Sequence, residues 1–175
     1  YADAPWESHA QFIQLMVVAV CELTRHLIPA MQTRHKGYII NVASLAGLVP
    51  GSAGHTLYAA SKAFLVRFSE SLALENLHSG VHVSALCPGF TWSEFHDVAG
   101  TREIVNKLPA WMWMDAEEVV TYGLDSVFGD PPRVIAIPGA VNRMIARLMR
   151  YLPSGLAFSI TRRMSRRFRA QKGIH

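Results

Sequence analysis

The chain has 175 residues, half of them hydrophobic, which is enough material to bury the core of one domain. Its two cysteines have no spacing typical of a metal site or a disulfide framework, and no uninterrupted apolar run reaches the roughly 18 residues that span a bilayer. The sequence also shows no charged-then-apolar signal peptide, so we expect a cytoplasmic chain.

Charge is distributed unevenly along the sequence. Residues 1–130 contain 7 Lys and Arg against 13 Asp and Glu, whereas residues 131–175 contain 10 basic residues and no acid. The net charge of +4 therefore combines an acidic body with a basic tail.

The first 54 residues predict a helix, a strand and a loop. Residues 3–31 place apolar side chains at helical spacing, with Pro5 near the start and Pro29 near the end. Residues 37–44 form a short β-branched run that a glycine opens, and residues 45–54 are rich in glycine and proline. We interpret these two segments as a strand and the loop that follows it.

Four further elements continue the alternation. Residues 57–80 carry an apolar helical stripe that Gly80 stops, and residues 81–89 form a second apolar strand ended by Pro88. Residues 115–129 begin with an aspartate and first-turn acids, which are typical of a helix N-terminus, and residues 132–139 resemble a third strand. Long helices between short apolar strands indicate a parallel sheet covered on both faces, so we predict an α/β fold.

Reactive side chains follow the carboxyl ends of these strands, where α/β sheets open into a crevice. The first strand delivers Ser44, and the next helix carries Tyr58 and Lys62 on one face because they are four residues apart. A nearby ammonium stabilises a phenolate, which makes the phenol a credible general acid or base. In isolation the same pair would be an ordinary tyrosine and a solvated lysine.

Three segments together resemble the short-chain dehydrogenase/reductase family: NVASLAG at 41–47, YAASK at 58–62 and CPGFTWSEF at 87–95. The resemblance implies that Tyr58 is the proton donor or acceptor, that Lys62 binds the ribose of a bound NAD or NADP, and that Ser44 holds the substrate oxygen. It further implies that Tyr58 and Lys62 contact the cofactor and that its nicotinamide carboxamide is lined by Pro88, Gly89, Thr91 and Ser93. Ser93 stands where the family usually has threonine and keeps the hydroxyl.

The same resemblance implies a Rossmann-like doubly wound sheet and an NAD(P)-dependent interconversion of a carbonyl and an alcohol. Two departures qualify it. Met16 stands where many members carry a catalytic asparagine, and a thioether cannot relay a proton, so Gln14 or backbone carbonyls would have to hold a water instead. The sequence also contains no G-x-G-x-x-G. We therefore expect residues 1–139 to be the C-terminal half of the domain, with the N-terminal nucleotide-binding half missing.

Aromatic side chains concentrate in the segment that forms the substrate lid of the resembled family. They are either core filling or the wall of a wide apolar pocket for a lipid-like, steroid-like or aromatic carbonyl. The residues proposed for this pocket are Phe90, Trp92, Phe95, Trp111 and Trp113.

Residues 140–175 are predicted to form a basic amphipathic helical tail. One apolar stripe (Met144, Ile145, Leu148 and Met149) is expected to pack over the crevice, whereas residues 156–170 suit either packing or peripheral contact with a membrane surface. Nucleic acid is disfavoured because aromatic residues are not interleaved for base stacking, and the eight histidines show no metal-ligand spacing. The alternative to an enzyme is a non-catalytic interaction module, and self-association into a homo-oligomer is expected under both interpretations.

Overall fold

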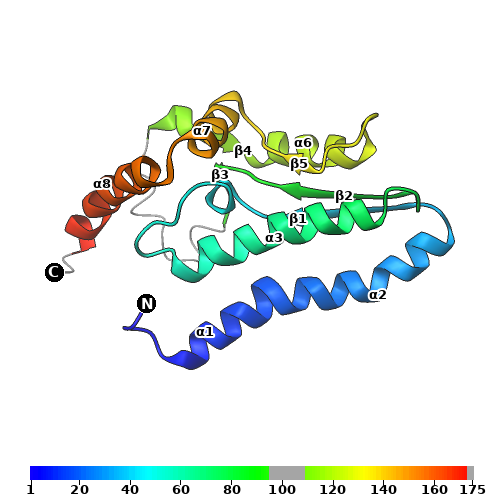
Figure 1. Ribbon diagram of the computed structural model, residues 1–175, viewed down its shortest axis with the longest axis horizontal. Coiled ribbons are helices and arrows are strands. Elements are labelled where there is room, and N and C mark those ends of the chain that lie inside the picture. Colours follow the sequence, from blue (N-terminus) through cyan, green and yellow to red (C-terminus); the bar gives the residue numbers. More distant parts are fainter. Residues whose placement is uncertain (95–108, 173–175) are drawn as a thin grey trace.

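The computed structural model describes residues 1–94 and 109–172, with side chains up to Ser165 except Met164. Its main sheet has the strand order β1 (Gly37–Val42), β2 (Val81–Leu86) and β5 (Ile135–Ala136), and both strand pairs are parallel. Gly37 pairs with Val81 and Val42 with Leu86, so the carboxyl ends of β1 and β2 lie side by side (Figure 1). The predicted α/β fold is confirmed.

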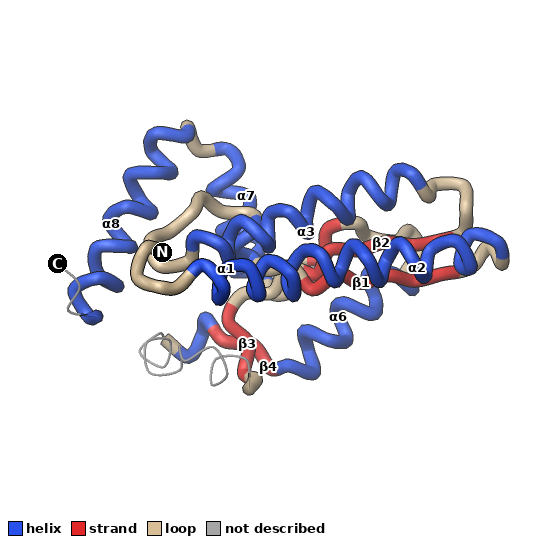
Figure 2. Tube along the Cα trace, turned by 90° about the horizontal axis from the view of Figure 1, so that it is seen from below, coloured by secondary structure: helices blue, strands red, loops and turns tan. Residues whose placement is uncertain are grey.

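Helices cover both faces of this sheet. The helix α3 (Thr56–Glu75) and the long N-terminal helical run lie on one face, and α6 (Ala116–Phe128) lies on the other (Figure 2). The α3 side of the core is formed by Ala43, Leu65, Val66, Ala85 and Cys87, and the α6 side by Leu86, Val119 and Ala136. Strand β2 is almost entirely buried between these layers, as expected for a parallel strand covered on both faces.

Strand β5 is much shorter than the predicted strand at 132–139, because only Ile135 and Ala136 are paired. Prolines at 131, 132 and 138 bracket these residues, and a proline cannot donate a ladder hydrogen bond. The backbone nevertheless stays close to β2, since the Ala85 amide donates to Val134 (2.8 Å) and the Cys87 amide donates to Ala136 (2.7 Å).

The N-terminal helical run consists of α1 (Trp6–Ile13), a π-helical turn η1 (Gln14–Val18) and α2 (Ala19–Thr33), with Pro29 inside α2. Its length and composition are compatible with a membrane span: an 18-residue window has mean hydropathy 1.4, and 6% of that window is buried. A search for uninterrupted apolar runs does not find this helix. Scattered polar residues interrupt the runs but lower the mean hydropathy of the segment only slightly. A core helix of a soluble protein passes the same test, so the feature is weak evidence for a membrane.

A second, two-stranded parallel sheet pairs β3 (Phe90–Trp92) with β4 (Trp113–Asp115), preceded by the short helix η3 (Ala110–Met112). The sequence predicted no helix or strand between residues 89 and 115. Beyond β5 the chain forms α7 (Ala140–Tyr151) and α8 (Ser154–Lys172), which lie at the end of the molecule where the strands terminate (Figure 1). Ser165 on α8 accepts a hydrogen bond from the Ala53 amide (3.1 Å), so α8 is held against the loop that precedes α3.

Candidate active site

Ser44 lies just beyond the carboxyl end of β1 and caps the short 3-10 helix η2 (Leu45–Gly47). Its backbone is extended, and its hydroxyl accepts a hydrogen bond from the Ala46 amide at 3.1 Å. The next amide, that of Leu45, donates to the Pro88 carbonyl at 2.8 Å. This bond ties the serine turn to the loop that follows β2, so two of the predicted site segments are joined directly.

Tyr58 lies in the first turn of α3 and is half-buried. The His55 ring meets the Tyr58 ring edge-on, with 6.3 Å between centroids. One turn of helix below, the buried Ser61 hydroxyl donates to the Tyr58 carbonyl at 2.9 Å. The phenol is therefore carried on a regular, well-anchored turn of helix at the end of the sheet where chemistry is expected.

Lys62 is the charged residue that α3 buries. Its side chain is 8% exposed, its Nζ donates to the Val42 carbonyl at 2.8 Å, and Nζ lies 5.7 Å from the centroid of the Tyr58 ring. Burial lowers the pKa of the Lys62 ammonium from its usual value, an effect that the nearby Cys87 thiol opposes. The structure thus brings Lys62 beside Tyr58, as the four-residue spacing predicts.

Gly47 explains how η2 approaches α3 so closely. A Cβ added at Gly47 would lie 2.6 Å from the carbonyl carbon and oxygen of Lys62, a distance that side chains essentially never adopt. The glycine therefore lets the serine turn contact the α3 backbone at the turn that carries the lysine.

Cys87 lies at the centre of this arrangement but is a core residue. It is fully buried, and burial raises the pKa of its thiol to about 12, with a hydrogen bond from the Ser44 backbone opposing the shift. The thiol is therefore neutral at physiological pH. Cys87 therefore acts as a core residue here.

The loop after β2 carries the residues predicted to line a nicotinamide. Pro88, Gly89 and Thr91 are half-buried, and the Thr91 hydroxyl donates to the Gly89 carbonyl at 3.3 Å. Ser93 is exposed. Pro88 contacts the serine turn through its carbonyl, whereas Ser93 lies further along, beyond β3.

Asn142 is a supporting residue that the sequence analysis missed. It is buried on α7, its amide nitrogen donates to the Pro138 carbonyl at 2.9 Å, and its side-chain oxygen would lie 2.5 Å from a Cβ added at Gly89. The first turn of α7 therefore packs directly against the predicted nicotinamide loop. The sequence did contain a signal for this role, because Asn142 is a polar residue within an otherwise apolar stripe, three positions after Gly139.

The predicted pocket aromatics separate into three groups. Phe90, Trp92 and Trp113 form one cluster, in which the Trp92 and Trp113 rings stack with centroids 4.0 Å apart and Phe90 lies 5.6 Å from Trp113. Trp113 is 8% exposed and Trp92 45% exposed, so the cluster runs from the core to the surface. Trp111 is exposed and takes no part in this cluster, and Phe95 lies outside the described residues.

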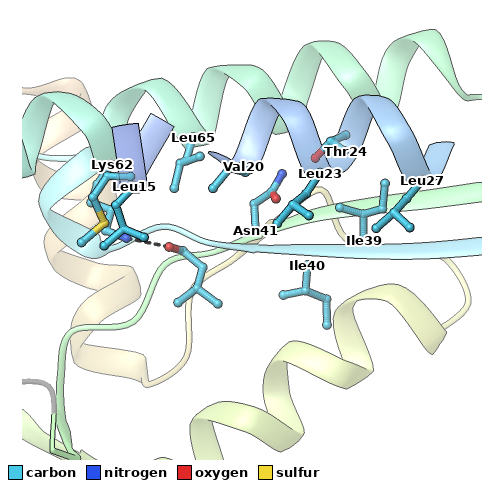
Figure 3. Close-up of a pocket in the computed structure, with 12 residues that line it drawn as sticks. Leu15, Val20, Leu23, Thr24, Leu27, Ile39, Ile40, Asn41, Lys62 and Leu65 are labelled. Carbon is cyan, nitrogen blue, oxygen red and sulfur yellow. Dashed lines mark hydrogen bonds between the residues drawn. The ribbon is translucent and has the colours of Figure 1, made fainter. Parts of the chain in front are cut away.

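Met16 lies in the π-helical turn η1, a type of distortion that recurs at functional sites. Its side chain and that of Lys62 line the same cavity of about 290 Å³, between the N-terminal helical run and β1 (Figure 3). Gln14, the suggested substitute for the absent asparagine, is exposed. The remaining lining is mostly apolar and includes Leu15, Leu23 and Leu27, whose side chains reach toward the strand.

Comparison with known proteins places this geometry in a family. The family model described as short chain dehydrogenase matches residues 2–103, which include Ser44, Tyr58, Lys62 and the loop after β2. The chain belongs to the short-chain dehydrogenase/reductase family. An uncharacterized oxidoreductase of Myxococcus xanthus is 33% identical over 165 residues, covering 91% of this chain and 59% of the relative.

Other members of the family extend the comparison. The very-long-chain 3-oxoacyl-CoA reductase of Bos taurus is 29% identical over 86% of this chain and 44% of its own. Among solved structures, a short-chain dehydrogenase from Sphingobium yanoikuyae in complex with NADPH has a TM-score of 0.69 at 28% identity, covering 88% of this chain and 60% of that one. A bulky-bulky ketone specific alcohol dehydrogenase from Comamonas testosteroni gives 0.63 at 25% identity, covering 88% of this chain and 58% of its own.

The chain spans about three fifths of the length of the Myxococcus relative and of these two solved structures. The predicted family and Rossmann-like fold are confirmed. The prediction that a nucleotide-binding half is missing is supported only in part, because the family model already matches from residue 2.

Proposed function

We propose that the chain provides the catalytic part of an NAD(P)-dependent oxidoreductase that interconverts a carbonyl and an alcohol. The observation that carries the proposal is the convergence of three elements at one end of the sheet: the Ser44 turn, the α3 turn with Tyr58 and Lys62, and the Pro88 loop. They are joined by the Leu45 to Pro88 hydrogen bond and by the close approach of Gly47 to Lys62.

Each residue has a role that follows from its chemistry. The Ser44 hydroxyl donates a hydrogen bond to the substrate oxygen, and the Tyr58 phenol gives that oxygen a proton in reduction and takes it back in oxidation. The Lys62 ammonium lies near the phenol ring, and its side chain is buried. Its positive charge therefore acts strongly on a developing phenolate.

The residues present suit the nicotinamide end of a dinucleotide. Lys62 offers a donor for ribose hydroxyls, and Gly89 lets the first turn of α7 pack directly against the loop that would contact the nicotinamide. When bound, the nicotinamide supplies or accepts the hydride at the carbonyl carbon. A relative with 28% identity is in complex with NADPH, which supports NADP or NAD as the cofactor. The glycine-rich turn that would hold the pyrophosphate is absent from this sequence.

An apolar substrate is the second part of the proposal. The cluster of Phe90, Trp92 and Trp113 begins directly after the predicted nicotinamide loop and presents partly exposed aromatic surface. The reductase of very-long-chain 3-oxoacyl-CoA and the dehydrogenase specific for bulky-bulky ketones are similar proteins whose substrates are large carbonyl compounds. A lipid-like, steroid-like or aromatic carbonyl is therefore the substrate class proposed for this chain, in a cytoplasmic homo-oligomer.

The proposal is tested by isotope transfer. The nucleotide-binding half of the Sphingobium enzyme is joined ahead of Tyr1, and this fusion is incubated with cofactor deuterated at the nicotinamide C4 and a panel of small and bulky ketones. We expect deuterium on the alcohol carbon, with bulky apolar ketones preferred, and a loss of at least roughly 100-fold in Ser44→Ala. Ser52→Ala, an exposed serine near the site, is the matched control and should keep its rate.

Two results would overturn the proposal. One is a fusion that binds cofactor but transfers no deuterium to any ketone, which would favour the non-catalytic interaction module. The other is an equal loss of the deuterium-transfer rate in Ser44→Ala and Ser52→Ala.

A further inference from the structure

The outer face of α7 is the part of the molecule whose chemistry the proposed function leaves unused. Residues 131–175 contain 10 basic residues and no acid, and α7 carries three of these arginines. The face itself consists of Ala140, Met144, Arg147, Leu148 and Tyr151, all exposed and spaced so that they lie on one side of the helix.

The rotation of α7 is fixed by its inner side. Asn142 and Ala146 are buried, and Asn142 is anchored on the Pro138 carbonyl. Because these contacts fix the inner side of α7 against the rest of the molecule, the opposite side of the helix faces solvent. Met144, Leu148 and Tyr151 are 63%, 56% and 82% exposed, and together with Ala140, Arg143 and Arg147 they line an open hollow of about 520 Å³.

This finding corrects an expectation. The stripe at 144–149 was expected to pack over the crevice, but the structure divides it: Ile145 and Met149 are half-buried, whereas Met144 and Leu148 face outward. In α8 the buried residues are small: Ala157, Thr161 and Ser165. Exposed apolar side chains beside arginines therefore occur on α7, which precedes in sequence the 156–170 segment for which membrane contact was predicted.

We propose that the outer face of α7 docks on an anionic lipid surface. Apolar side chains beside arginines on one helix face are the arrangement of interfacial helices, in which the apolar groups enter the acyl boundary and the arginines reach the headgroups. The absence of acidic residues after position 130 selects anionic headgroups rather than neutral ones.

Other occupants fit the same face less well. A second copy placed face to face would bring two arginine-bearing faces together without a compensating acid, which is unfavourable. Nucleic acid would use the arginines, yet it would leave Met144 and Leu148 in water. Both occupants are separate outcomes of the test below.

The proposal is tested by flotation of the 175-residue chain with lipid vesicles, which separates bound protein from aggregates. The vesicles are phosphatidylcholine alone, or phosphatidylcholine with about 30% phosphatidylglycerol to supply negative charge. We expect flotation with the anionic vesicles at about 0.1 M salt and release at about 0.5 M, because salt screens the attraction. Neutral vesicles should recover little protein.

Matched pairs of variants locate the surface. Arg147 on the outer face and Arg150 beside it are the two exposed arginines of α7. Arg147→Gln with Arg150→Gln is expected to weaken binding roughly 30-fold, since each basic residue near an anionic surface contributes a factor of about five. Arg25→Gln with Arg67→Gln makes the same charge change on exposed residues of the helices on the sheet face and should bind like wild type. Met144→Ser with Leu148→Ser is expected to lose at least about tenfold, against no loss for Leu74→Ser with Leu77→Ser.

Five outcomes overturn the proposal, and four of them concern flotation: no flotation with anionic vesicles, equal flotation with neutral ones, equal losses in the control pairs, or a loss from the arginine pair without a loss from the apolar pair. The last result would indicate an acidic macromolecule such as nucleic acid. A dimer in solution that Met144→Ser with Leu148→Ser dissociates would indicate a second copy. Circular dichroism confirms that each variant keeps its helix content.

Discussion

The two helical segments on the same face of the sheet are buried to very different degrees. α3 buries Ser61, Lys62, Leu65, Val66 and Ser69, whereas the run from Trp6 to Thr33 buries only Thr24. Leu65 on α3 is 2% exposed, whereas Leu15 and Leu23 on the N-terminal run are 66% and 62% exposed. The more buried helix is therefore the one that carries Tyr58 and Lys62.

This difference in burial distinguishes a well-packed region around α3 from an incompletely covered region along the N-terminal helical run. Around α3, polar groups are satisfied internally: Asn41 donates to Ser69, which donates to the Leu65 carbonyl, and Lys62 donates to Val42. Along the N-terminal run, apolar side chains line a cavity beside β1, and within the described residues β1 pairs only with β2 (Figure 3). The candidate site rests on the first region, and the second region is suited to bind a further apolar or extended segment.

The largest stability effect is expected where η2 meets α3. Gly47→Ala places a methyl group 2.6 Å from the Lys62 backbone, which cannot move without displacing the helix, so the free energy of unfolding should fall by about 3 kcal/mol. That loss corresponds to roughly 6–12 °C in Tm for a chain of this size. Gly51→Ala is the matched control, because nothing lies within 4 Å of its added Cβ. Thermal denaturation by circular dichroism measures both, and similar melting temperatures would contradict the close approach.

A smaller effect is expected along the open side. The exposed leucines, and the edge of β1 that has no strand partner among the described residues, should make the chain self-associate at micromolar concentration. Leu23→Lys should weaken that association at least roughly tenfold, whereas Leu74→Lys, at an equally exposed leucine on α3, should not. Analytical ultracentrifugation measures the change. A wild-type chain that stays monomeric and melts in a single sharp transition would show that this surface needs no partner.

The smallest effect concerns the buried ammonium. Because burial lowers the pKa of Lys62, folding penalises its charged form, and Lys62→Met should raise the free energy of unfolding at neutral pH. The unfolded chain binds the proton up to a higher pH than the folded chain, so the stability of wild type should rise toward that of the variant as pH approaches 10.5. Urea denaturation across pH measures the difference between the two, with Cys87 present in both. A variant less stable than wild type at pH 7 would show that the bond to Val42 outweighs the burial cost.

Much of this arrangement could be predicted from the sequence. Periodicity located the long helices and the first two strands, and the order of the three motifs placed Ser44, Tyr58 and Lys62 at one end of the sheet. Local patterns carry that information, because helical spacing and β-branched runs depend on residues close in sequence. The roles of these residues remain predictions.

The remainder depended on contacts between distant segments. The pairing of Phe90 with Trp113 joins residues that no local pattern connects. The buried residues of α8 with described side chains are small, and the Thr161 hydroxyl is satisfied within the helix by donating to the Ala157 carbonyl at 3.2 Å, so hydrophobicity alone does not identify this buried side. The rotation of α7 likewise depends on the buried Asn142 and Ala146, and not on the large apolar residues Met144 and Leu148, which are exposed.

The central claim is that Tyr58 moves the proton while Lys62 holds the cofactor and tunes the phenol. Steady-state kinetics and cofactor titration of the fusion test it most directly, with Tyr58→Phe and Lys62→Met compared with Tyr38→Phe, a tyrosine at the opposite end of β1. Tyr58→Phe should lower kcat by roughly 10²- to 10⁴-fold with cofactor affinity nearly unchanged. Lys62→Met should weaken cofactor binding and move the pH optimum upward, and Tyr38→Phe should do neither. Equal losses of kcat and affinity in the Tyr58 and Lys62 variants would contradict this division of labour.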